Sequence, residues 1–352
     1  MKGSPSSSGA APIAEARPHR ILLSYHYYRQ PLGPLLARFK YPVKVFGDSG
    51  AFSAWSLGKP IEVGEYADWL AENRGELEVY SNLDVIGDPK GTAKNQAELE
   101  RRGFNPIPVF HAGSEWSDLD RLIDAGYPYI ALGGLVDPNK RGAVMPYLVE
   151  CFIRARKAGK GTVFHGFGVT QLDAITGLPW FSVDSSSWGA AYRFGRLQLF
   201  NPITGRMTTI PLFDGAMLRR HRNLLARYGG TVEEFSDRKT YHHSSACRVS
   251  IRSWRAFEDW CRRRHGPIHL PGSADGIRLY LASTGGDLSQ GRVDAQDAAV
   301  EEMAKASGFR LYAADAAIEL HETANAGLHL YAAGTSTAAH KIANSTIGTG
   351  RK

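Results

Sequence analysis

Three aspartates each follow a short apolar run in the first part of the chain, where a strand would end. They are Asp48 in VKVFGDSGAF, Asp84 in SNLDV and Asp184 in FSVD. The small residues around Asp48 let the backbone come close to a ligand. Carboxylates can act as nucleophiles, as general acids or bases, or as hydrogen-bond acceptors for a bound base. These aspartates are therefore the first candidates for a reactive centre.

Other apolar runs end on residues that also suit contact with a ligand. Ser49 follows Asp48, and the other runs end on His111, on Gly133–Gly134–Leu135 and on Gly166. In an eight-stranded barrel the carboxyl ends of all strands meet, so residues far apart in sequence would form one set around one pocket. The alternative for any single aspartate is a helix N-cap, a common role for Asp after a strand.

The elements that would position these residues alternate regularly. Nearly continuous apolar or β-branched runs predict seven strands, at 21–28, 43–46, 78–83, 107–110, 129–132, 162–165 and 180–183. Helical periodicity predicts helices at 63–73, 90–102, 116–125, 143–158 and 170–175. No Gly-x-Gly-x-x-Gly opens the first helix, so a dinucleotide-binding sheet is disfavoured. The pattern predicts an α/β fold, specifically a (β/α)8 TIM barrel.

The alternation stops after Asp184. Residues 192–211 read as a β-hairpin, followed by basic helices at 216–228 and 251–265. Residues 277–283 would supply the closing strand and 297–307 a further helix, whereas 309–333 fits strand or helix. We therefore predict a disordered tail at 1–18 and a flexible tail at 335–352. Between them, the barrel at 19–334 would include the hairpin and a basic helical insertion at about 214–270.

Composition limits the classes of partner and location. Lys and Arg outnumber Asp and Glu by 42 to 35, giving a net charge of +7. This balance favours a polyanion such as nucleic acid, and the alternative is a merely basic protein. Three cysteines are too few for a disulfide scaffold, and neither a signal peptide nor a membrane-spanning run is present. We expect a cytoplasmic protein that does not bind membranes.

Six motifs together resemble the tRNA-guanine transglycosylase superfamily in order and approximate spacing. They are DSGAF from Asp48, SNLDV, PVFHAG, ALGGL, HGFGV and FSVD, and they span about residues 43–210. The departures make the chain most similar to the phage and bacterial 7-deazaguanine DNA transglycosylases, which are DNA-modification enzymes. The resemblance implies a (β/α)8 barrel that exchanges guanine in DNA for a free 7-deazaguanine base such as 7-cyano-7-deazaguanine. It implies no required cofactor.

The resemblance also implies a role for each matching residue. Asp184 resembles the nucleophile that attacks C1′, and Asp48 resembles the acid/base that deprotonates the incoming base. Asp84 resembles the acceptor for the guanine N1–H and 2-amino group, and His111 stands where the family usually has Gln. The implied substrate-binding set is Ser49, Asp84, His111, Gly133, Gly134, Leu135 and Gly166.

Basic residues and a possible zinc site complete these expectations. Arg193 and Arg196 lie where the family contacts phosphate and sugar, and the run Arg262-Arg263-Arg264 either contacts nucleic acid or complements its helix dipole. The tRNA enzymes carry a structural zinc after the hairpin. Here two i, i+4 pairs suggest a two-His, two-Cys site, although Cys on a helix is also common as core filling; the four residues are His243, Cys247, Cys261 and His265.

Three other functions stay open on the sequence. The same exchange could act on tRNA, although the family's zinc motif is incomplete here. A barrel metallohydrolase would use strand-end ligands such as His26, His111, His165 and Asp184. A non-catalytic nucleic-acid-binding barrel would explain the positive charge but not three acids at strand ends.

Overall fold

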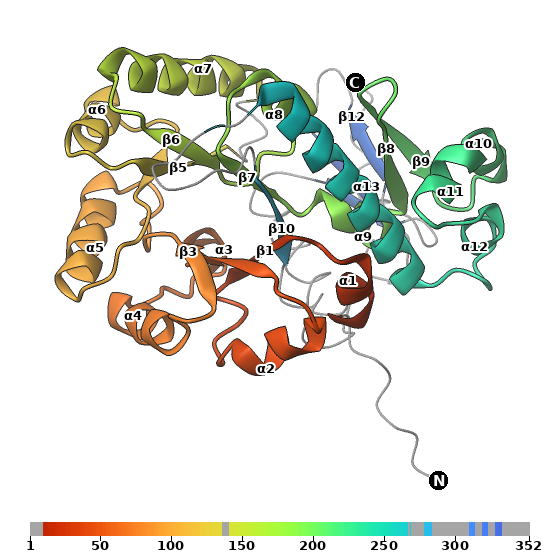
Figure 1. Cartoon of the computed structure of the whole chain (residues 1–352), viewed down its shortest axis with the longest axis horizontal. Helices are drawn as coiled ribbons and strands as arrows, with labels where there is room; N and C mark the ends of the chain where they lie inside the picture. Colours follow the sequence, from red (N-terminus) through yellow and green to blue (C-terminus); the bar gives the residue numbers. More distant parts are fainter. Residues whose placement is uncertain are drawn as a thin grey trace, which may run out of the picture. The chain divides into compact units, whose positions relative to one another are not determined.

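The computed structural model describes residues 10–135, 141–266, 268, 278–283, 310–313, 319–322 and 328–332 (Figure 1). The chain divides into two compact units. The first unit comprises Met1–Ser186 and Phe257–Gly291, and the second comprises Ser187–Ala256 and Arg292–Lys352.

The first unit is built on an eight-stranded sheet with the order β3-β2-β1-β10-β7-β6-β5-β4. Every neighbouring pair in it is parallel. An isolated parallel bridge joins Ser81, just after β3, to Ile107, just before β4. The strands are β1 (Arg20–Ser24), β2 (Lys44–Asp48), β3 (Leu77–Tyr80), β4 (Val109–His111), β5 (Tyr129–Gly133), β6 (Val163–Gly166), β7 (Ser182–Ser185) and β10 (Arg278–Ser283).

All seven predicted strands are confirmed, with ends that shift by a few residues. The predicted closing strand at 277–283 is also confirmed, because β10 pairs with both β1 and β7. These strands are continuous apolar runs because both faces of the sheet are covered. The protein is therefore of the α/β class with a parallel sheet.

Helices connect successive strands, as the periodicity predicts. They are α4 (Val63–Glu72), α5 (Pro89–Arg101), α6 (Trp116–Asp124), α7 (Arg141–Ala158) and α8 (Leu172–Gly177). Shorter helices precede and follow β1 and β2: α1 (Ala10–Ala16), α2 (Gly33–Leu36) and α3 (Ala51–Ser56). The prediction of a disordered tail at 1–18 is wrong for residues 10–16, because Ile13 and Ala16 of α1 are buried.

Aromatic and aliphatic side chains of the strands form a buried core in the first unit. Phe46, Tyr129, Phe181 and Tyr280 belong to one buried cluster. Phe46 and Tyr280 pack edge to face with ring centroids 5.2 Å apart. Because these rings are closely packed, the strands are held firmly, and so are the polar residues at their carboxyl ends.

The second unit contains the hairpin and most of the basic helices. The hairpin is β8 (Arg196–Asn201) and β9 (Arg206–Pro211), preceded by α9 (Ala190–Phe194). The predicted hairpin at 192–211 therefore starts too early. The helices that follow are α10 (Gly215–Arg220), α11 (Arg222–Arg227), α12 (Val232–Ser236) and the first part of α13 (His243–His265).

Two helix predictions in this region need correction. The helix predicted at 216–228 is broken at His221, whose φ of −106° and ψ of 19° are not helical. The helix predicted from 251 begins eight residues earlier, at His243. Strands β11 (Arg310–Ala313), β12 (Glu319–Glu322) and β13 (Leu328–Ala332) form a three-stranded sheet, so the ambiguous segment at 309–333 contains strands.

Two expectations lie outside the described residues, namely the helix at 297–307 and the tail at 335–352. Within the described ranges, no helix combines the length and apolar character needed to cross a bilayer.

Candidate active site

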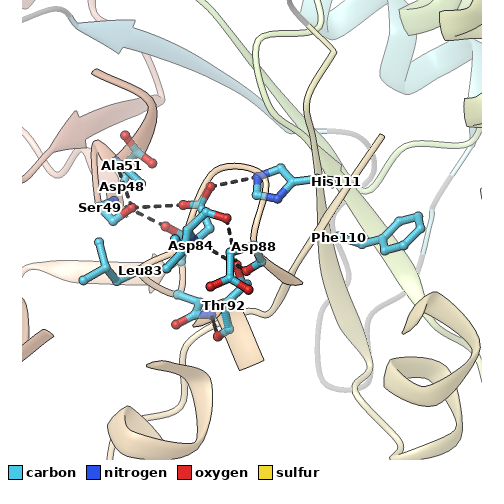
Figure 2. Close-up of polar contacts among 12 residues, drawn as sticks. Asp48, Ser49, Ala51, Leu83, Asp84, Asp88, Thr92, Phe110 and His111 are labelled. Atoms are coloured by element: carbon cyan, nitrogen blue, oxygen red, sulfur yellow. Dashed lines mark hydrogen bonds and ion pairs between the residues drawn. The ribbon is translucent and has the colours of Figure 1, made fainter. Parts of the chain in front are cut away.

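Asp84 is held between two strand ends of the first unit. Figure 2 shows its carboxylate between Ser49, just after β2, and His111, the last residue of β4. The Ser49 hydroxyl donates to Asp84 Oδ1 at 3.3 Å, and His111 Nε2 lies 2.8 Å from Oδ2. Both oxygens are thereby oriented, and each keeps a further lone pair for a ligand donor. The structure thus brings together three residues of the predicted substrate-binding set.

Asp48 is the last residue of β2 and is fixed by a tight turn. The Gly50 N–H donates to Asp48 Oδ2 at 3.0 Å. Gly50 has a φ of +75°, and a Cβ there would lie 2.3 Å from Ser24 Oγ and 2.4 Å from His26 Cβ. Only glycine fits this turn without displacing its neighbours. The helix that follows, α3, has Gly50 as its N-cap residue, so Asp48 does not have the N-cap role that the sequence left open.

The pKa of Asp48 is raised from 3.8 to about 7. Burial is the largest cause, followed by the negative charges of Asp84 and Asp184, while Ser24 and the Gly50 N–H act in the opposite direction. The three aspartates therefore interact electrostatically at the same end of the sheet. A carboxyl group with this pKa can give up or accept a proton near neutral pH.

Asp184 lies within β7 and is buried. Its Oδ1 accepts a hydrogen bond from the Gly168 N–H at 2.8 Å and lies 3.4 Å from His165 Nε2. The loop that supplies Gly168 is tightly packed, since a Cβ on Gly166 would lie 2.5 Å from the side chain of Val169. Among the described residues, the hydrogen bond and the close histidine contact of Asp184 both involve Oδ1 and neither involves Oδ2.

His165 is completely buried beneath Asp184 and is the site residue whose position the sequence does not reveal. It stacks on Phe46 with ring centroids 4.5 Å apart, and its Nδ1 is hydrogen-bonded to the Ser182 hydroxyl. Ser182 is also hydrogen-bonded to the hydroxyl of Tyr129. Burial lowers the pKa of His165, while Asp184 acts in the opposite direction. The sequence signal is a histidine inside an apolar strand, which by itself suggests only a metal ligand.

This chain of hydrogen bonds selects one tautomer of His165. If Nδ1 carried the proton, the lone pair of Nε2 would face the Asp184 carboxylate and repel it. If Ser182 donates to Nδ1 instead, the Nε2–H faces Asp184 Oδ1 and attracts it. An ionised Asp184 therefore favours the second arrangement, in which Tyr129 donates to Ser182.

Gly133 allows the close approach of His111. The two residues are paired in neighbouring strands β5 and β4. A Cβ on Gly133 would lie 2.6 Å from His111 Cδ2. Gly134 is exposed with a φ of +74°, and Leu135 is half-buried. The glycine pair therefore shapes the chain beside the Asp84–His111 pair.

The predicted nucleic-acid-binding arginines belong to different units. Arg193 and Arg196 lie in the second unit, where the guanidinium of Arg193 stacks 5.5 Å from the ring centroid of Phe194. The run 262–264 lies in the last turn of α13, in the first unit. Arg263 is exposed there, and Arg264 lies 5.4 Å from the Trp260 ring centroid.

The proposed two-His, two-Cys zinc site does not form. His243, Cys247, Cys261 and His265 all belong to the single helix α13. Cys247 and Cys261 are separated by about 21 Å along a continuous helix, at a rise of about 1.5 Å per residue. Burial raises the pKa of the Cys261 thiol to about 12, as suits a core-filling side chain. Across the described ranges, no three His, Cys, Asp or Glu side chains gather to hold a metal ion.

No protein-family model and no curated protein matches this chain. The geometry of the first unit therefore defines the site by itself. It is a set of three carboxylates, one of them with a pKa near neutrality, at the carboxyl end of a parallel sheet.

Proposed function

We propose that the protein is a transglycosylase that exchanges guanine in DNA for a 7-deazaguanine base through a covalent Asp184 intermediate. The observation that supports it best is the pKa of Asp48, which burial and, after it, the charges of Asp84 and Asp184 raise to about 7. Base exchange needs one carboxylate as nucleophile and another that accepts a proton, and their different surroundings suit these two roles. We further propose that the parallel sheet, with its Ser81–Ile107 bridge, is a closed (β/α)8 barrel.

In the first half of the reaction, Asp184 Oδ2 attacks C1′ of the target nucleotide and the bond from C1′ to guanine N9 breaks. The electron pair of that bond leaves with guanine, which takes up one proton from water. The sugar develops positive charge as the bond breaks, and the nearby carboxylate stabilises this charge before bonding to C1′. The Gly168 N–H on Oδ1 orients the nucleophile for attack through the other oxygen.

In the second half, the incoming 7-deazaguanine base occupies the place of guanine. Asp48 accepts the proton from N9 of that base as N9 bonds to C1′, and the bond to Asp184 breaks. The pKa of about 7 lets Asp48 accept this proton at neutral pH and release it afterwards. The Asp184 carboxylate is then regenerated.

Recognition of the base would fall to Asp84. A guanine ring presents N1–H and 2-amino donors on one edge, and a carboxylate oriented by two partners can accept from both. Ser49 and His111 supply that orientation. In this proposal His111 acts through Asp84. A histidine can therefore occupy the position at which the transglycosylase superfamily usually has Gln. Backbone N–H groups of 133–135 would contact the exocyclic oxygen of the base.

His165 would act as a positioning residue for Asp184. Its Nε2–H faces Oδ1, so it stabilises the ionised carboxylate and favours attack through Oδ2. The same exchange on tRNA would use the same carboxylates, so the distinction between DNA and tRNA depends on the polymer offered. The metallohydrolase has no gathered donor set among the described residues, and we do not propose it.

The test offers guanine-containing DNA and tRNA side by side, each with radiolabelled guanine or 7-cyano-7-deazaguanine. We expect label to enter DNA, with stoichiometric release of guanine when the 7-deaza base is used. Incorporation into tRNA alone would contradict the DNA assignment. No incorporation into either polymer, by protein that remains folded, would contradict base exchange altogether.

A further inference from the structure

Three exposed aromatic side chains lie together on the first unit. Trp55 and Phe52 of α3 are 60% and 42% exposed, and Tyr27, just after β1, is 37% exposed. The ring centroids of Phe52 and Trp55 are 6.0 Å apart, and the Tyr27 hydroxyl donates to Ser53 Oγ at 3.2 Å. Single exposed apolar residues are ordinary, whereas a group of them marks an interaction site. Together Tyr27, Phe52 and Trp55 form the aromatic patch.

The aromatic patch is joined to the turn that holds Asp48. Strands β1 and β2 pair with Ser24 opposite Asp48, so both segments that carry the patch leave the sheet at the same end. Figure 2 shows Ala51, the first residue of α3, close to Asp48. The segment after β1 packs against this turn, since a Cβ on Gly50 would lie 2.4 Å from His26 Cβ. The patch and the proposed reactive centre therefore belong to the same unit and to the same end of its sheet.

Two cations lie near the patch, around His26. Burial lowers the pKa of the His26 imidazole, and the charges of Arg29 and Lys59 lower it further. The His26 ring packs edge-on against Tyr27, with ring centroids 4.8 Å apart. Arg29 is paired with Glu65 at 3.8 Å, whereas Lys59 is exposed and forms no ion pair with any described residue. Lys59 is therefore the cation that a phosphate could use.

Exposed aromatic rings beside a solvated lysine suit an unpaired strand of nucleic acid. Such a strand offers base faces that stack on aromatic side chains and phosphates that attract cations. In a duplex the neighbouring base pairs already cover those faces. A protein partner could also cover aromatic rings, but the net charge of +7 favours a polyanion.

We infer that Trp55 and Tyr27 stack on unpaired bases of the DNA strand beside the target guanine, and that Lys59 contacts a phosphate of that strand. The inference rests on the proposed function, because exchange at C1′ requires the target nucleotide to leave the base stack. Its neighbours then lose a stacking partner, and the aromatic patch replaces it. Phe52 supports the Trp55 ring from within the same helix.

The stacking is tested by measuring the affinity of the full chain for single-stranded oligo(dT) and for its duplex with oligo(dA), neither of which contains guanine. Trp55→Ala should weaken single-strand binding by at least about fivefold, the lower end of the contribution of one stacked base. Duplex binding should change by less than about twofold, since no base face is free. Trp55→Phe keeps a ring and should bind the single strand within about threefold of the parent.

A matched control separates stacking from a general loss of apolar surface. Ile153→Ala shortens another exposed apolar side chain of the first unit, on α7, and should bind oligo(dT) like the parent. Equal losses in Trp55→Ala and Ile153→Ala, or equal losses of Trp55→Ala on single strand and duplex, would overturn the stacking. Tyr27→Ala should also weaken single-strand binding, whereas Tyr27→Phe, which removes only the hydroxyl, should not.

The phosphate contact is tested by repeating the oligo(dT) titration over a range of salt concentrations. One phosphate contact on a single strand contributes about 0.7 to the slope of log K against log salt, so Lys59→Gln should lower the slope by about that amount. Lys157→Gln removes the same charge from an exposed lysine of α7 and should leave the slope unchanged. Equal slopes for the two variants would overturn the Lys59 assignment.

The outcomes separate this inference from the proposed function. If DNA supports base exchange but Trp55→Ala binds oligo(dT) like the parent, the inference is wrong and the proposed function stands. If no polymer supports exchange but oligo(dT) binding still depends on Trp55, base exchange fails and the stacking surface stands. Tighter binding of oligo(rU) than of oligo(dT) would overturn the DNA assignment. A change of oligomeric state in Trp55→Ala, measured by light scattering, without loss of oligo(dT) binding would assign the patch to a protein contact.

Discussion

The two units hold charge in opposite ways. In the first unit, three carboxylates gather at the end of an apolar sheet, and burial, followed by their mutual repulsion, raises the pKa of Asp48 to about 7. In the second unit, Arg220 and Arg227 are solvated beside a cleft without acidic lining. Crowded like charges cost free energy to keep together, whereas exposed arginines cost little. The contrast suits the reaction that we propose for the first unit, and it leaves the cations of the second unit accessible to solvent.

The largest loss of exchange activity is expected when Asp184 is replaced. We expect Asp184→Ala to reduce exchange by about 10⁴-fold or more, because removal of a covalent nucleophile abolishes the two-step path. Binding of duplex DNA should stay within about threefold, since most of the affinity for a duplex comes from contacts between cations and phosphates, which this substitution does not remove. Label incorporation and a binding titration measure the two effects. Asp173→Asn, which changes an exposed carboxylate of the first unit, is the control and should leave both unchanged.

Replacement of Asp48 should cause a smaller but still large loss of exchange activity. Asp48→Asn should slow exchange by about 10²- to 10⁴-fold, the usual contribution of a general base. In the parent protein the rate should rise with pH through about 7, as Asp48 ionises. The variant should lack this rise. A variant that kept the parent's pH profile would show that another group accepts the proton.

The same carboxylate should make stability depend on pH. Its folded-state pKa is above the ordinary value of 3.8, so folding favours the protonated form. Stability from this group is full below about pH 4 and falls as the pH rises toward 7. Asp48→Asn should therefore be more stable than the parent at pH 8, by about 2 kcal/mol after allowance for solvent screening, and similar at pH 4. Urea unfolding at the two pH values measures the difference.

A substitution in the turn that fixes Asp48 should have an intermediate effect on stability and on exchange activity. Gly50→Ala adds a methyl group within 2.4 Å of Ser24 and His26 at a positive φ, and should cost about 3 kcal/mol of stability and lower exchange. Gly58→Ala is matched, because Gly58 also has a positive φ but a Cβ there would meet no atom within 4 Å. It should cost only about 1 kcal/mol. Equal losses would mean that strain, and not the close packing beside Asp48, dominates.

The smallest effects on exchange activity are expected for His165 and Ser182, which are linked to Asp184. His165→Ala should lower kcat by about tenfold with little change in KM, and Ser182→Ala should lower it by about threefold, because the serine only selects the tautomer. Both losses should persist when the rates are normalised to the amount of folded protein. A merely structural role would lower the amount of folded protein without lowering kcat per folded molecule.

The sequence predicts the strands well because buried parallel strands are continuous apolar runs. It predicts Asp48, Asp84 and His111 at one end of the sheet for the same reason, since parallel strands bring their carboxyl ends together. It does not predict the Tyr129–Ser182–His165 chain, because Tyr129 and Ser182 are 53 residues apart and no local pattern links them. The zinc prediction is wrong because the polar residues at 243–250 led us to place the start of the helix at 251. In the structure α13 already begins at His243, so all four residues of the predicted site lie on one helix.

The central claim is the covalent bond between Asp184 and the sugar. The direct measurement mixes the protein with guanine-containing DNA in the absence of added base, quenches it in denaturant and identifies the attached peptide by mass spectrometry. The account predicts a DNA–protein adduct on the peptide that contains Asp184, which forms with the parent and with Asp173→Asn but not with Asp184→Ala. An adduct on Asp48, or active protein that exchanges base without any adduct, would contradict it.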